Sequence, residues 1–548
     1  MKNYVLFLLL FLSSKSILAW QIDTTTITHA QKLIGFEFTP PEKDSMLDDL
    51  RGNVRNYEKM RSLPLPNSLA YPFAFNPAPA GFRIPTKQLP IQWTIPANIK
   101  IPSNKNELAY FSILELASLI KSKKISSVDL TRFFIARLKK WNDSLECVIT
   151  LTEELAMQQA KAADAEIAKG KYRGPLHGIP YGLKDLFAVK GYKTTWGSVP
   201  YKDQVIDEDA FVYTQLKNAG AVLCAKLSMG ELAFADLWFG GKTKNPWNLR
   251  LGSSGSSAGS AAATSAGLLP FAIGTETYGS IISPSHTCGV TGLRPTFGSI
   301  SRSGAMVLSW SLDKAGPICH SAEDAAIVFH YLKGTDGKDA GAVARPFNYD
   351  PKKDIKKLKI AYAANYFNPL PKTLEQWKVL EDFKKMGIDL IEVQFPDSTI
   401  YPFNMMDPII SAESAAAFDE LTRSNKDDLI RRQDKNFWPN GFRSSRFIPA
   451  VDYINANRHR SSLITSLNLF MKQYDVIIVP SFSGSQLAMT NLSGHPSLVV
   501  PIGINTNGRP NSITFLGNLY DEETILAVAV AFQKATNYHN VHPPKFKE

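Results

Sequence analysis

Apolar residues recur at helical spacing through much of the chain, and short unbroken apolar runs stand between these stretches. One helix is expected after Ser126, which has capping-box spacing with Asp129, because the apolar residues that follow fall on one helical face. A second, alanine-rich helix is expected over residues 153–171. Buried strands are expected at residues 221–223, 476–479 and 497–502. Helices that alternate with such strands predict an α/β fold.

The part of the chain before this α/β pattern is organised differently. Residues 26–61 show helical periodicity, clearest over 43–60, and predict one or two helices. From residue 63 to about residue 105 the chain holds too many prolines for a regular helix or a central strand. We interpret residues 20–106 as a helical and proline-rich arm. We expect its Tyr and Phe residues to hold the proline-rich stretch against the main body. The alternative is that this stretch is a mobile tether.

Residues 1–19 have the pattern of a secretory signal peptide. Lys2 supplies the positive start, residues 5–12 the apolar run and Ala19 a cleavage position. The apolar run is shorter than the about 20 residues needed to cross a bilayer, so no membrane span is expected after cleavage. The alternative is that the segment is kept as an uncleaved anchor. Ile17 lies two residues before Ala19, where signal peptides usually have a small residue. The pattern predicts a periplasmic or secreted protein.

The composition is that of an ordinary globular protein and gives no sign of a nucleic-acid partner. The chain has 548 residues, 44% of them hydrophobic and 20% charged, which is typical of globular proteins. Its net charge is +11, but the basic residues are scattered and no nucleic-acid motif accompanies them, so no nucleic-acid partner is expected. The cysteines show neither metal spacing nor a disulfide framework, and we expect free, buried thiols. They are Cys147, Cys224, Cys288 and Cys319.

Two glycine-containing segments carry the candidate chemistry. Residues 174–185 read GPLHGIPYGLKD, and residues 251–280 read LGSSGSSAGSAAATSAGLLPFAIGTETYGS. A Ser/Gly run is typical of linkers, but this one continues into an apolar segment that belongs in a core. No phosphate-binding loop occurs here, and no cluster of metal ligands stands out. We therefore expect neither a cofactor nor a metal.

These segments, in this order, resemble the amidase signature family. The matching blocks are residues 178–185, 254–260, 274–281, 288–296 and 311–317. The resemblance covers about residues 107–536, with the core motifs in 176–325. It implies one large α/β domain, residues 107–540, in which helices flank a mixed central sheet.

The resemblance also implies a role for each site residue. Ser280 is the expected nucleophile, Ser256 the serine that bridges protons, and Lys184 the general base. Lys184 must be neutral to accept a proton, and burial favours that form. In the family the bond corresponding to Gly255–Ser256 is a cis peptide, and the residue at Ser257 supports the lysine. The histidines near these motifs, such as His177, fit no Ser-His-Asp order, which leaves the lysine as the base.

The turn that ends on Ser280 departs from the family pattern at two positions. Tyr278 stands where the family usually has Gly, and its ring could wall the acyl pocket. Ile282 stands where relatives carry an Arg that pairs with the acidic residue of the turn, so Glu276 needs another partner. Backbone N–H groups of the turn are expected to stabilise the oxyanion, which requires no particular side chain. The turn consists of Thr277, Tyr278, Gly279 and Ser280.

The resemblance fades over residues 350–462, a part that varies among relatives and often lines the substrate entrance. Here we expect a strand near 358–361 and helices over 373–386 and 408–430. Aromatic and arginine residues gather in the same part, and they form either a binding lip or ordinary packing. These residues are Phe437, Trp438, Phe442, Phe447, Arg431, Arg432, Arg443 and Arg446.

Taken together, the motifs predict an exported amidase that converts a small-molecule or peptide amide to an acid plus ammonia or an amine through an acyl-enzyme. Peptide C-terminal, fatty, aryl and small aliphatic amides all remain open as substrates. Two other functions fit the same motifs. One is the amidase subunit of a tRNA-dependent amidotransferase, and the other is a non-catalytic binding protein on the amidase scaffold.

Overall fold

The computed structural model describes residues 22–61, 67, 73–396 and 406–548 of the chain. The expected signal peptide, residues 1–19, lies outside the described residues. By its internal contacts the chain divides into two compact units, Met1–Pro66 and Asn67–Glu548. The described part holds no helix that is both long and apolar enough to cross a membrane.

The described part of the first unit is helical, as its periodicity predicts, but it holds three helices rather than the one or two expected. It contains α1 (Thr24–Ile34), α2 (Pro40–Ser45) and α3 (Leu47–Arg61). The side chain of Asp23 accepts a hydrogen bond from the Thr26 N–H at 2.7 Å, which caps the start of α1. Gly35, at a φ of 69°, ends the same helix in the left-handed region.

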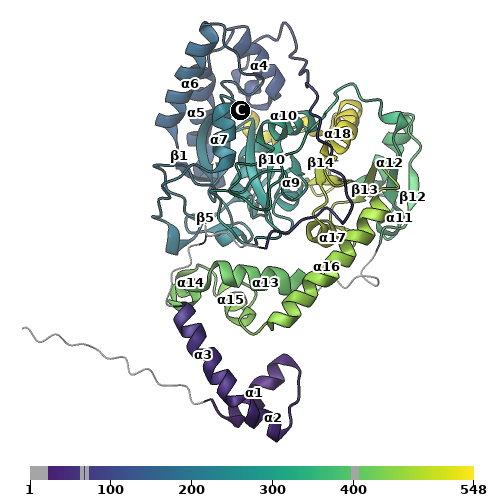
Figure 1. The fold of residues 1–548 in the computed structure, drawn as a ribbon. Helices are drawn as coiled ribbons and strands as arrows, with labels where there is room; N and C mark the ends of the chain where they lie inside the picture. Colours follow the sequence, from purple (N-terminus) through teal and green to yellow (C-terminus); the bar gives the residue numbers. More distant parts are fainter. Residues whose placement is uncertain (1–21, 62–66, 68–72, 397–405) are drawn as a thin grey trace, which may run out of the picture. The chain divides into compact units, whose positions relative to one another are not determined.

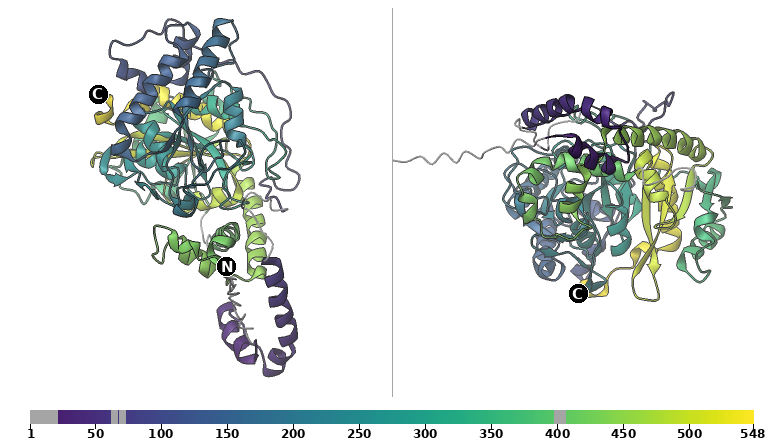
Figure 2. Two further views of the ribbon diagram at one scale, coloured as in Figure 1. Left: turned by 90° about the vertical axis from the view of Figure 1, so that its left-hand side faces the viewer. Right: turned by 90° about the horizontal axis from the view of Figure 1, so that it is seen from below.

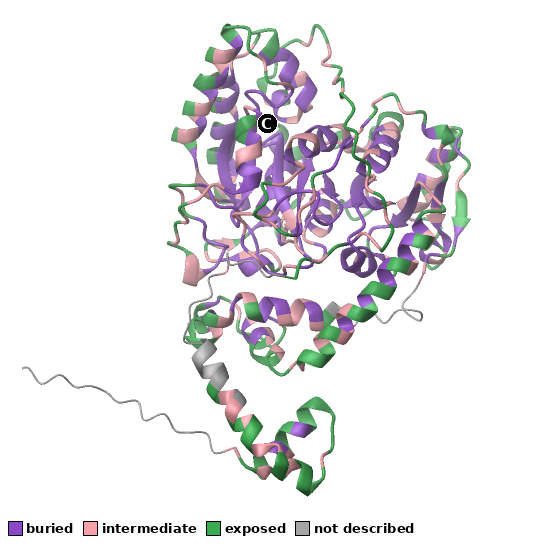
Figure 3. Cartoon of the chain, in the orientation of Figure 1, coloured by how far each residue is buried: buried purple, intermediate pink, exposed green. Residues whose placement is uncertain are grey.

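A mixed sheet forms the centre of the second unit. Its eleven strands, all within the described residues, run in the order β1-β3-β2-β8-β10-β9-β14-β15-β13-β11-β12. The strands are β1 (Val148–Leu151), β2 (Pro180–Lys184), β3 (Val222–Leu227), β8 (Phe271–Glu276), β9 (Thr291–Arg294), β10 (Lys314–Cys319), β11 (Ile360–Ala363), β12 (Ile391–Val393), β13 (Val476–Pro480), β14 (Ser497–Ile504) and β15 (Pro510–Gly517). Strand β2 pairs in parallel with β3 and β8, and β11 with β12 and β13, while the other pairs are antiparallel. The strands are largely buried (Figure 3), which explains their unbroken apolar runs.

Helices flank the sheet (Figures 1 and 2), which confirms the predicted α/β class. They are α4 (Ile113–Lys121), α5 (Ser127–Leu145), α6 (Glu153–Ala168), α7 (Phe211–Asn218), α8 (Ala258–Ser265), α9 (Ile282–Cys288), α10 (Ala322–Leu332), α11 (Ala364–Phe367), α12 (Glu375–Lys385), α13 (Met406–Ala417), α14 (Asp419–Arg423), α15 (Trp438–Ser445), α16 (Ala450–Met471), α17 (Gln486–Ser493) and α18 (Glu522–Thr536). Two short hairpins, β4 (Leu237–Trp238) with β5 (Gly241–Lys242) and β6 (Lys244–Asn245) with β7 (Asn248–Gly252), precede α8.

The variable part differs from the sequence prediction in one helix. The segment 408–430 does not form a single helix but contains α13, α14 and a 3-10 turn, Lys426–Leu429. The break falls at Phe418, which is buried and stacks on Phe442 with ring centroids 5.4 Å apart. Burying this ring takes precedence over continuing the helix.

Helix α8 packs against β2 and β8, the strands that carry Lys184 and Thr275, and consists of small residues. All eight of its residues, AGSAAATS, are buried. A Cβ built on Gly259 would lie 2.5 Å from the Cys147 carbonyl oxygen and 2.6 Å from the Ser228 nitrogen. Only glycine allows this approach, so the Ser/Gly run continues into a core helix rather than a linker.

Residues 73–104, the proline-rich arm, pack along the second unit. The side-chain amide of Gln88 donates to the carbonyl of Phe347 at 2.8 Å and accepts from its N–H at 2.9 Å. Trp93 stacks on Tyr349 with centroids 5.6 Å apart, and Phe75 meets Phe297 edge-on at 4.9 Å. These contacts favour a packed arm over a mobile tether for this stretch.

The aromatic and arginine residues near 440 form mainly packing. Phe437 and Phe442 are buried, and Trp438 stacks on Phe442 at 5.1 Å. Arg443 pairs with Asp427 at 2.6 Å, which ties the cluster to the preceding turn. The four cysteines are free and buried, as expected.

Candidate active site

Lys184 ends strand β2 and is fully buried. Its Nζ lies 2.8 Å from Ser256 Oγ, 3.1 Å from Ser257 Oγ and 2.9 Å from Thr275 Oγ1. The parallel pairing of β2 with β8 brings Thr275 to the lysine, although the two residues are far apart in sequence. The structure therefore places one amine among three hydroxyl groups.

Ser256 and Ser257 stand at the start of α8. The peptide bond between Gly255 and Ser256 is cis, as the resemblance implies. A Cβ at Gly255 would lie 1.8 Å from the Ala235 carbonyl oxygen, so no larger residue fits there. Ser257 Oγ donates to the Thr275 carbonyl at 3.0 Å and accepts from the Thr275 N–H at 3.1 Å. These bonds fix the hydroxyl that faces the lysine.

Ser280 lies in the turn between β8 and α9, next to this serine pair. Its carbonyl accepts a hydrogen bond from the Ser257 N–H at 3.2 Å. Gly279 has a φ of 91°, whereas Tyr278 is outside the left-handed region, so the departure from glycine at 278 does not strain the backbone. The backbone N–H groups of Tyr278, Gly279 and Ser280 have no acceptor among the described residues, which leaves them available to an oxyanion.

Glu276 pairs with Arg294 and Asn491, which take the place of the arginine that relatives carry at the position of Ile282. Its Oε1 accepts from Arg294 Nη1 at 2.7 Å and from Asn491 Nδ2 at 2.9 Å. Its Oε2 accepts from the backbone N–H groups of Ile281 and Ile282, at 2.9 and 3.0 Å. The carboxylate therefore shapes the turn that presents Ser280.

The electrostatics of the site favour the neutral form of the buried Lys184 amine. Burial lowers the pKa of Lys184 to about 7, although Asp313 and Glu276 oppose this shift. Burial alone would raise the pKa of Glu276, but Arg294 and Lys314 bring it down to about 2. Near neutral pH, Glu276 is thus ionised while a large fraction of Lys184 is neutral.

A further carboxylate holds the turn from the opposite side. Asp313 Oδ1 accepts from Thr277 Oγ1 at 2.6 Å. Its Oδ2 accepts from the backbone N–H groups of Leu308 and Ser309, at 2.8 and 3.0 Å. Asp313 thereby joins the turn before Ser280 to the loop at 308–309.

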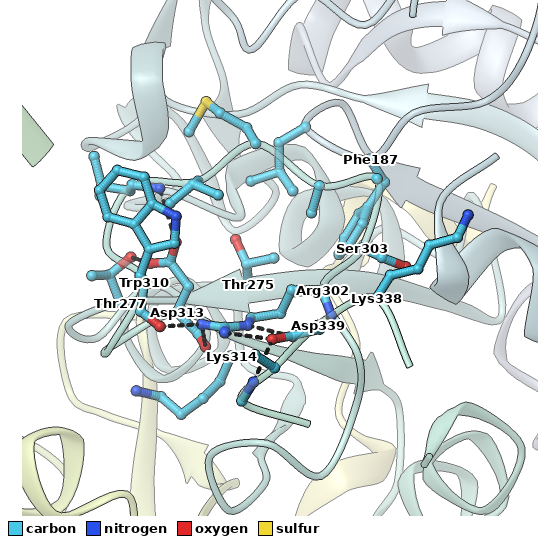
Figure 4. A pocket seen from close by; sticks show the side chains of 18 of the residues that line it. Phe187, Thr275, Thr277, Arg302, Ser303, Trp310, Asp313, Lys314, Lys338 and Asp339 are labelled. Carbon is cyan, nitrogen blue, oxygen red and sulfur yellow. Dashed lines mark hydrogen bonds and ion pairs between the residues drawn. The ribbon is translucent and has the colours of Figure 1, made fainter. Parts of the chain in front are cut away.

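A cavity of about 180 Å³ adjoins the site. Thr275 and Thr277 line it, which connects it to Lys184 and to the turn of Ser280. Figure 4 shows Trp310 and Phe187 on opposite sides of this space with Thr275 between them. Tyr278 is not among the lining residues, and 44% of its surface is exposed. Lys184, Ser256 and Ser280 do not line this cavity either, so the expectation that the Tyr278 ring walls the acyl pocket stays a prediction.

The sequence prediction missed four residues that build the site. Thr275 contacts the lysine, Asp313 holds Thr277, and Arg294 and Asn491 hold Glu276. Three of them lie in or beside matching motif blocks, where buried polar residues could have marked them. Asn491, on α17, carries no local signal because its partner is more than two hundred residues away. Among the described residues no group of three or more His, Cys, Asp or Glu is arranged to hold a metal ion.

The comparisons with known proteins agree with this geometry. The sequence model of the Amidase family matches residues 129–526. The glutamyl-tRNA(Gln) amidotransferase A subunit of Coxiella burnetii is 33% identical over 484 residues, covering 79% of this chain and 99% of its own length. The corresponding protein of Methylococcus capsulatus is 32% identical and covers 79% of this chain and 98% of its own.

Solved structures agree as well. The native peptide amidase of Stenotrophomonas maltophilia is 26% identical, with a TM-score of 0.71 over 81% of this chain and 100% of its own. An amidase family protein of Bacillus anthracis has the same identity, 26%, and the same TM-score, 0.71, over 80% of this chain and 93% of its own. The match to the family model, which spans most of the second unit, shows that this chain belongs to the amidase family.

Proposed function

We propose that this protein hydrolyses carboxylic amides through an acyl-enzyme on Ser280, with Ser256 as the proton bridge and Lys184 as the general base. The observation that carries the proposal is the buried Lys184 amine, whose pKa is about 7 and whose Nζ lies 2.8 Å from Ser256 Oγ. A lysine with an ordinary pKa would be protonated near pH 7 and could not accept a proton.

The proposed steps combine the Lys184–Ser256 contact with the role of nucleophile that the family resemblance gives to Ser280. Neutral Lys184 accepts the Ser256 hydroxyl proton while Ser256 takes the proton of Ser280, and Ser280 Oγ attacks the amide carbonyl. The tetrahedral intermediate collapses as Ser256 returns a proton to the departing amine and the C–N bond breaks. A water molecule then attacks the ester carbon and gives its proton to the same relay, which frees the acid and Ser280.

The turn before Ser280 supplies the stabilising donors. The N–H groups of Tyr278, Gly279 and Ser280 have no acceptor among the described residues, and Glu276 and Asp313 fix the turn from two sides. Removing one oxyanion donor typically costs about a hundredfold or more in rate, so a rigid turn matters. Ser257 and Thr275 position the lysine amine without themselves moving protons.

The test uses the purified chain with two variants of the relay. Wild type should release ammonia from at least one member of a panel of primary amides, and a fluorophosphonate should label Ser280. Ser280→Ala and Lys184→Ala should lower kcat by about ten-thousandfold or more. Ser283→Ala serves as the control, because Ser283 is partly exposed three residues further on and its Oγ pairs with Ser254 Oγ at 2.7 Å instead.

Each alternative outcome has a clear meaning. Full activity in either relay variant would contradict the site. Absence of both turnover and labelling in folded wild type would favour the non-catalytic binding protein. Labelling that persists in Ser280→Ala but disappears in Ser283→Ala would assign the nucleophile to Ser283 instead.

A second candidate function is the amidase subunit of a tRNA-dependent amidotransferase. The observation in its favour is the 33% identity to the glutamyl-tRNA(Gln) amidotransferase protein of Coxiella burnetii over 79% of the chain. A protein with this function should hydrolyse glutamine in preference to other amides and should copurify with partner subunits from its own cells. A chain that turns over amides alone and is recovered without partners supports the hydrolase instead.

We further propose that the mature protein is exported. The support is the signal-peptide pattern of residues 1–19, with its short apolar run and Ala19. Fractionation of the source cells followed by N-terminal sequencing tests this directly. A mature chain that begins after Ala19 outside the cytoplasm is expected, and a full-length chain in the cytoplasm would contradict export.

A further inference from the structure

The cavity beside Thr275 and Thr277 has the size and lining of an acyl-binding pocket. At about 180 Å³ it slightly exceeds a cavity of about 150 Å³ in another protein that is apolar and binds benzene. The space therefore holds one aromatic ring with a short linker. A long alkyl chain would extend out of it into solvent, and an acetyl group would leave most of it unfilled.

Apolar and aromatic side chains supply most of the walls. Phe187 and Trp310 face each other across the cavity, with Thr275 between them (Figure 4). Met306 and Leu308 also line it and are themselves buried. Flat aromatic walls favour a ring in stacked or edge-on contact. The arm contributes Phe73 and Ala74 at the same cavity.

The guanidinium that lines the cavity is already neutralised. Arg302 donates from Nε and Nη2 to the two carboxylate oxygens of Asp339, each at 2.8 Å. Its Nη1 donates to the carbonyls of Trp310 and Asp313, at 2.7 and 3.2 Å. Each nitrogen of this guanidinium thus donates to a protein oxygen, and its charge is balanced without a substrate carboxylate. Four further titratable residues line the cavity. Glu208 and Lys338 carry opposite charges, and Asp313 already accepts from Thr277 Oγ1 and from two backbone N–H groups. Lys314 Nζ donates to the Leu312 carbonyl, and burial lowers the pKa of this amine well below its usual value.

From these observations we propose that the enzyme is selective for amides with an uncharged aryl or arylalkyl acyl group about one ring in size, which binds between Phe187 and Trp310. This specificity rests on the proposed amidase function of Ser280. It favours aryl amides over the fatty and small aliphatic amides that the motifs left open and over the zwitterionic glutamine, because each of these fits the cavity less well than benzamide or 3-phenylpropionamide.

The experiment holds the leaving group constant and varies the acyl group. Wild type is assayed for ammonia release from acetamide, benzamide, 3-phenylpropionamide, glutamine and hexadecanamide. Because filling an apolar pocket changes kcat/KM by about tenfold or more, one of the two aryl amides should exceed every other member by at least about tenfold. A best substrate among acetamide, glutamine or hexadecanamide would overturn the specificity while leaving the hydrolase intact.

A variant that fills the cavity from its rim tests the location. Ala340 lines the cavity and is exposed, so Ala340→Trp adds a ring with little effect on the core. It should lower kcat/KM for 3-phenylpropionamide about tenfold and leave that for acetamide within about twofold. Ala165→Trp, at an exposed position of α6, is the matched control and should change neither. An equal loss on both amides in Ala340→Trp would overturn the location.

Labelling separates failure of this inference from failure of the proposed function. If fluorophosphonate labels Ser280 but no amide of the panel turns over, protection from labelling by phenylboronic acid is compared with methylboronic acid. Protection by the phenyl compound at about tenfold lower concentration supports the pocket, and equal protection overturns it. If Ser280 is not labelled at all, the proposed function fails and the specificity falls with it.

Discussion

The buried amine of Lys184 is the proposed general base, and its lowered pKa predicts how activity depends on pH. Only the neutral amine accepts a proton, and burial sets its pKa at about 7. We therefore expect kcat/KM to rise with pH through an acid limb centred near pH 7 and to level off above it. A pH–rate profile at aryl-amide concentrations well below KM, at constant ionic strength, measures this limb. An activity that falls as pH rises from 6 to 8 would contradict the base assignment.

Asp313 offers a way to move that limb. Its charge raises the pKa of Lys184, so Asp313→Asn should shift the acid limb to lower pH. The amide oxygen of asparagine can still accept from Thr277 Oγ1, which preserves much of the turn. The paired measurement is the same pH–rate profile, since a merely structural effect would lower the plateau without moving the limb.

Glu276 is a buried charge that holds the turn ending on Ser280. Glu276→Gln leaves Arg294 buried without a counter-charge, and breaking such a pair typically costs about 3 to 5 kcal/mol. Urea unfolding should show that loss in the free energy of unfolding. The folded pKa of about 2 lies below the unfolded value, so the charge stabilises above about pH 4 and the effect is lost as pH falls toward 2. A change under about 0.5 kcal/mol at pH 7 would contradict this role.

Among the elements, α8 most constrains the site, because its packing sets where Ser256 and Ser257 stand. Gly259→Ala should destabilise the second unit by about 1 to 3 kcal/mol, since the added Cβ meets backbone atoms at 2.5 and 2.6 Å. Gly441→Ala in α15, within the same unit, is the opposite control, because its Cβ meets only Trp438 Cε3 at 3.8 Å and alanine favours a helix by about 1 kcal/mol. Denaturant midpoints should move in opposite directions, and equal shifts would contradict the packing argument.

At the scale of the whole second unit, residues 73–104 of the arm contact Phe347 and Tyr349 and also contribute Phe73 and Ala74 to the wall of the cavity. Gln88→Ala removes both bonds to Phe347, and Trp93→Ala removes the stack on Tyr349. The double variant should be cleaved faster by a protease within residues 73–104. It should also lose aryl-amide activity more than acetamide activity, because Phe73 and Ala74 line the cavity. Unchanged cleavage rates would show that these contacts do not hold the arm.

The elements and residues that depend on local sequence pattern could be predicted from the sequence. Periodicity predicted α5, α6 and the strands β3, β13 and β14, and the motif resemblance named Lys184 and the serines that the fold brings to it. It could not predict contacts that depend on sheet order, such as Asn491 reaching Glu276 or Asp313 reaching Thr277. Nor could periodicity show that burial of Phe418 would divide the helix expected over 408–430.

The burial of all four cysteines has a practical consequence. Burial raises the pKa of the Cys147 thiol to about 12, and it raises those of Cys224, Cys288 and Cys319 as well. Thiolates rather than thiols react with alkylating reagents, so the folded protein should be silent toward maleimides. A single cysteine placed at an exposed site such as Ala340 would then accept a fluorophore alone. The native thiols become accessible only when the protein unfolds. Their rate of labelling by short pulses of maleimide in denaturant would therefore report the rate of unfolding.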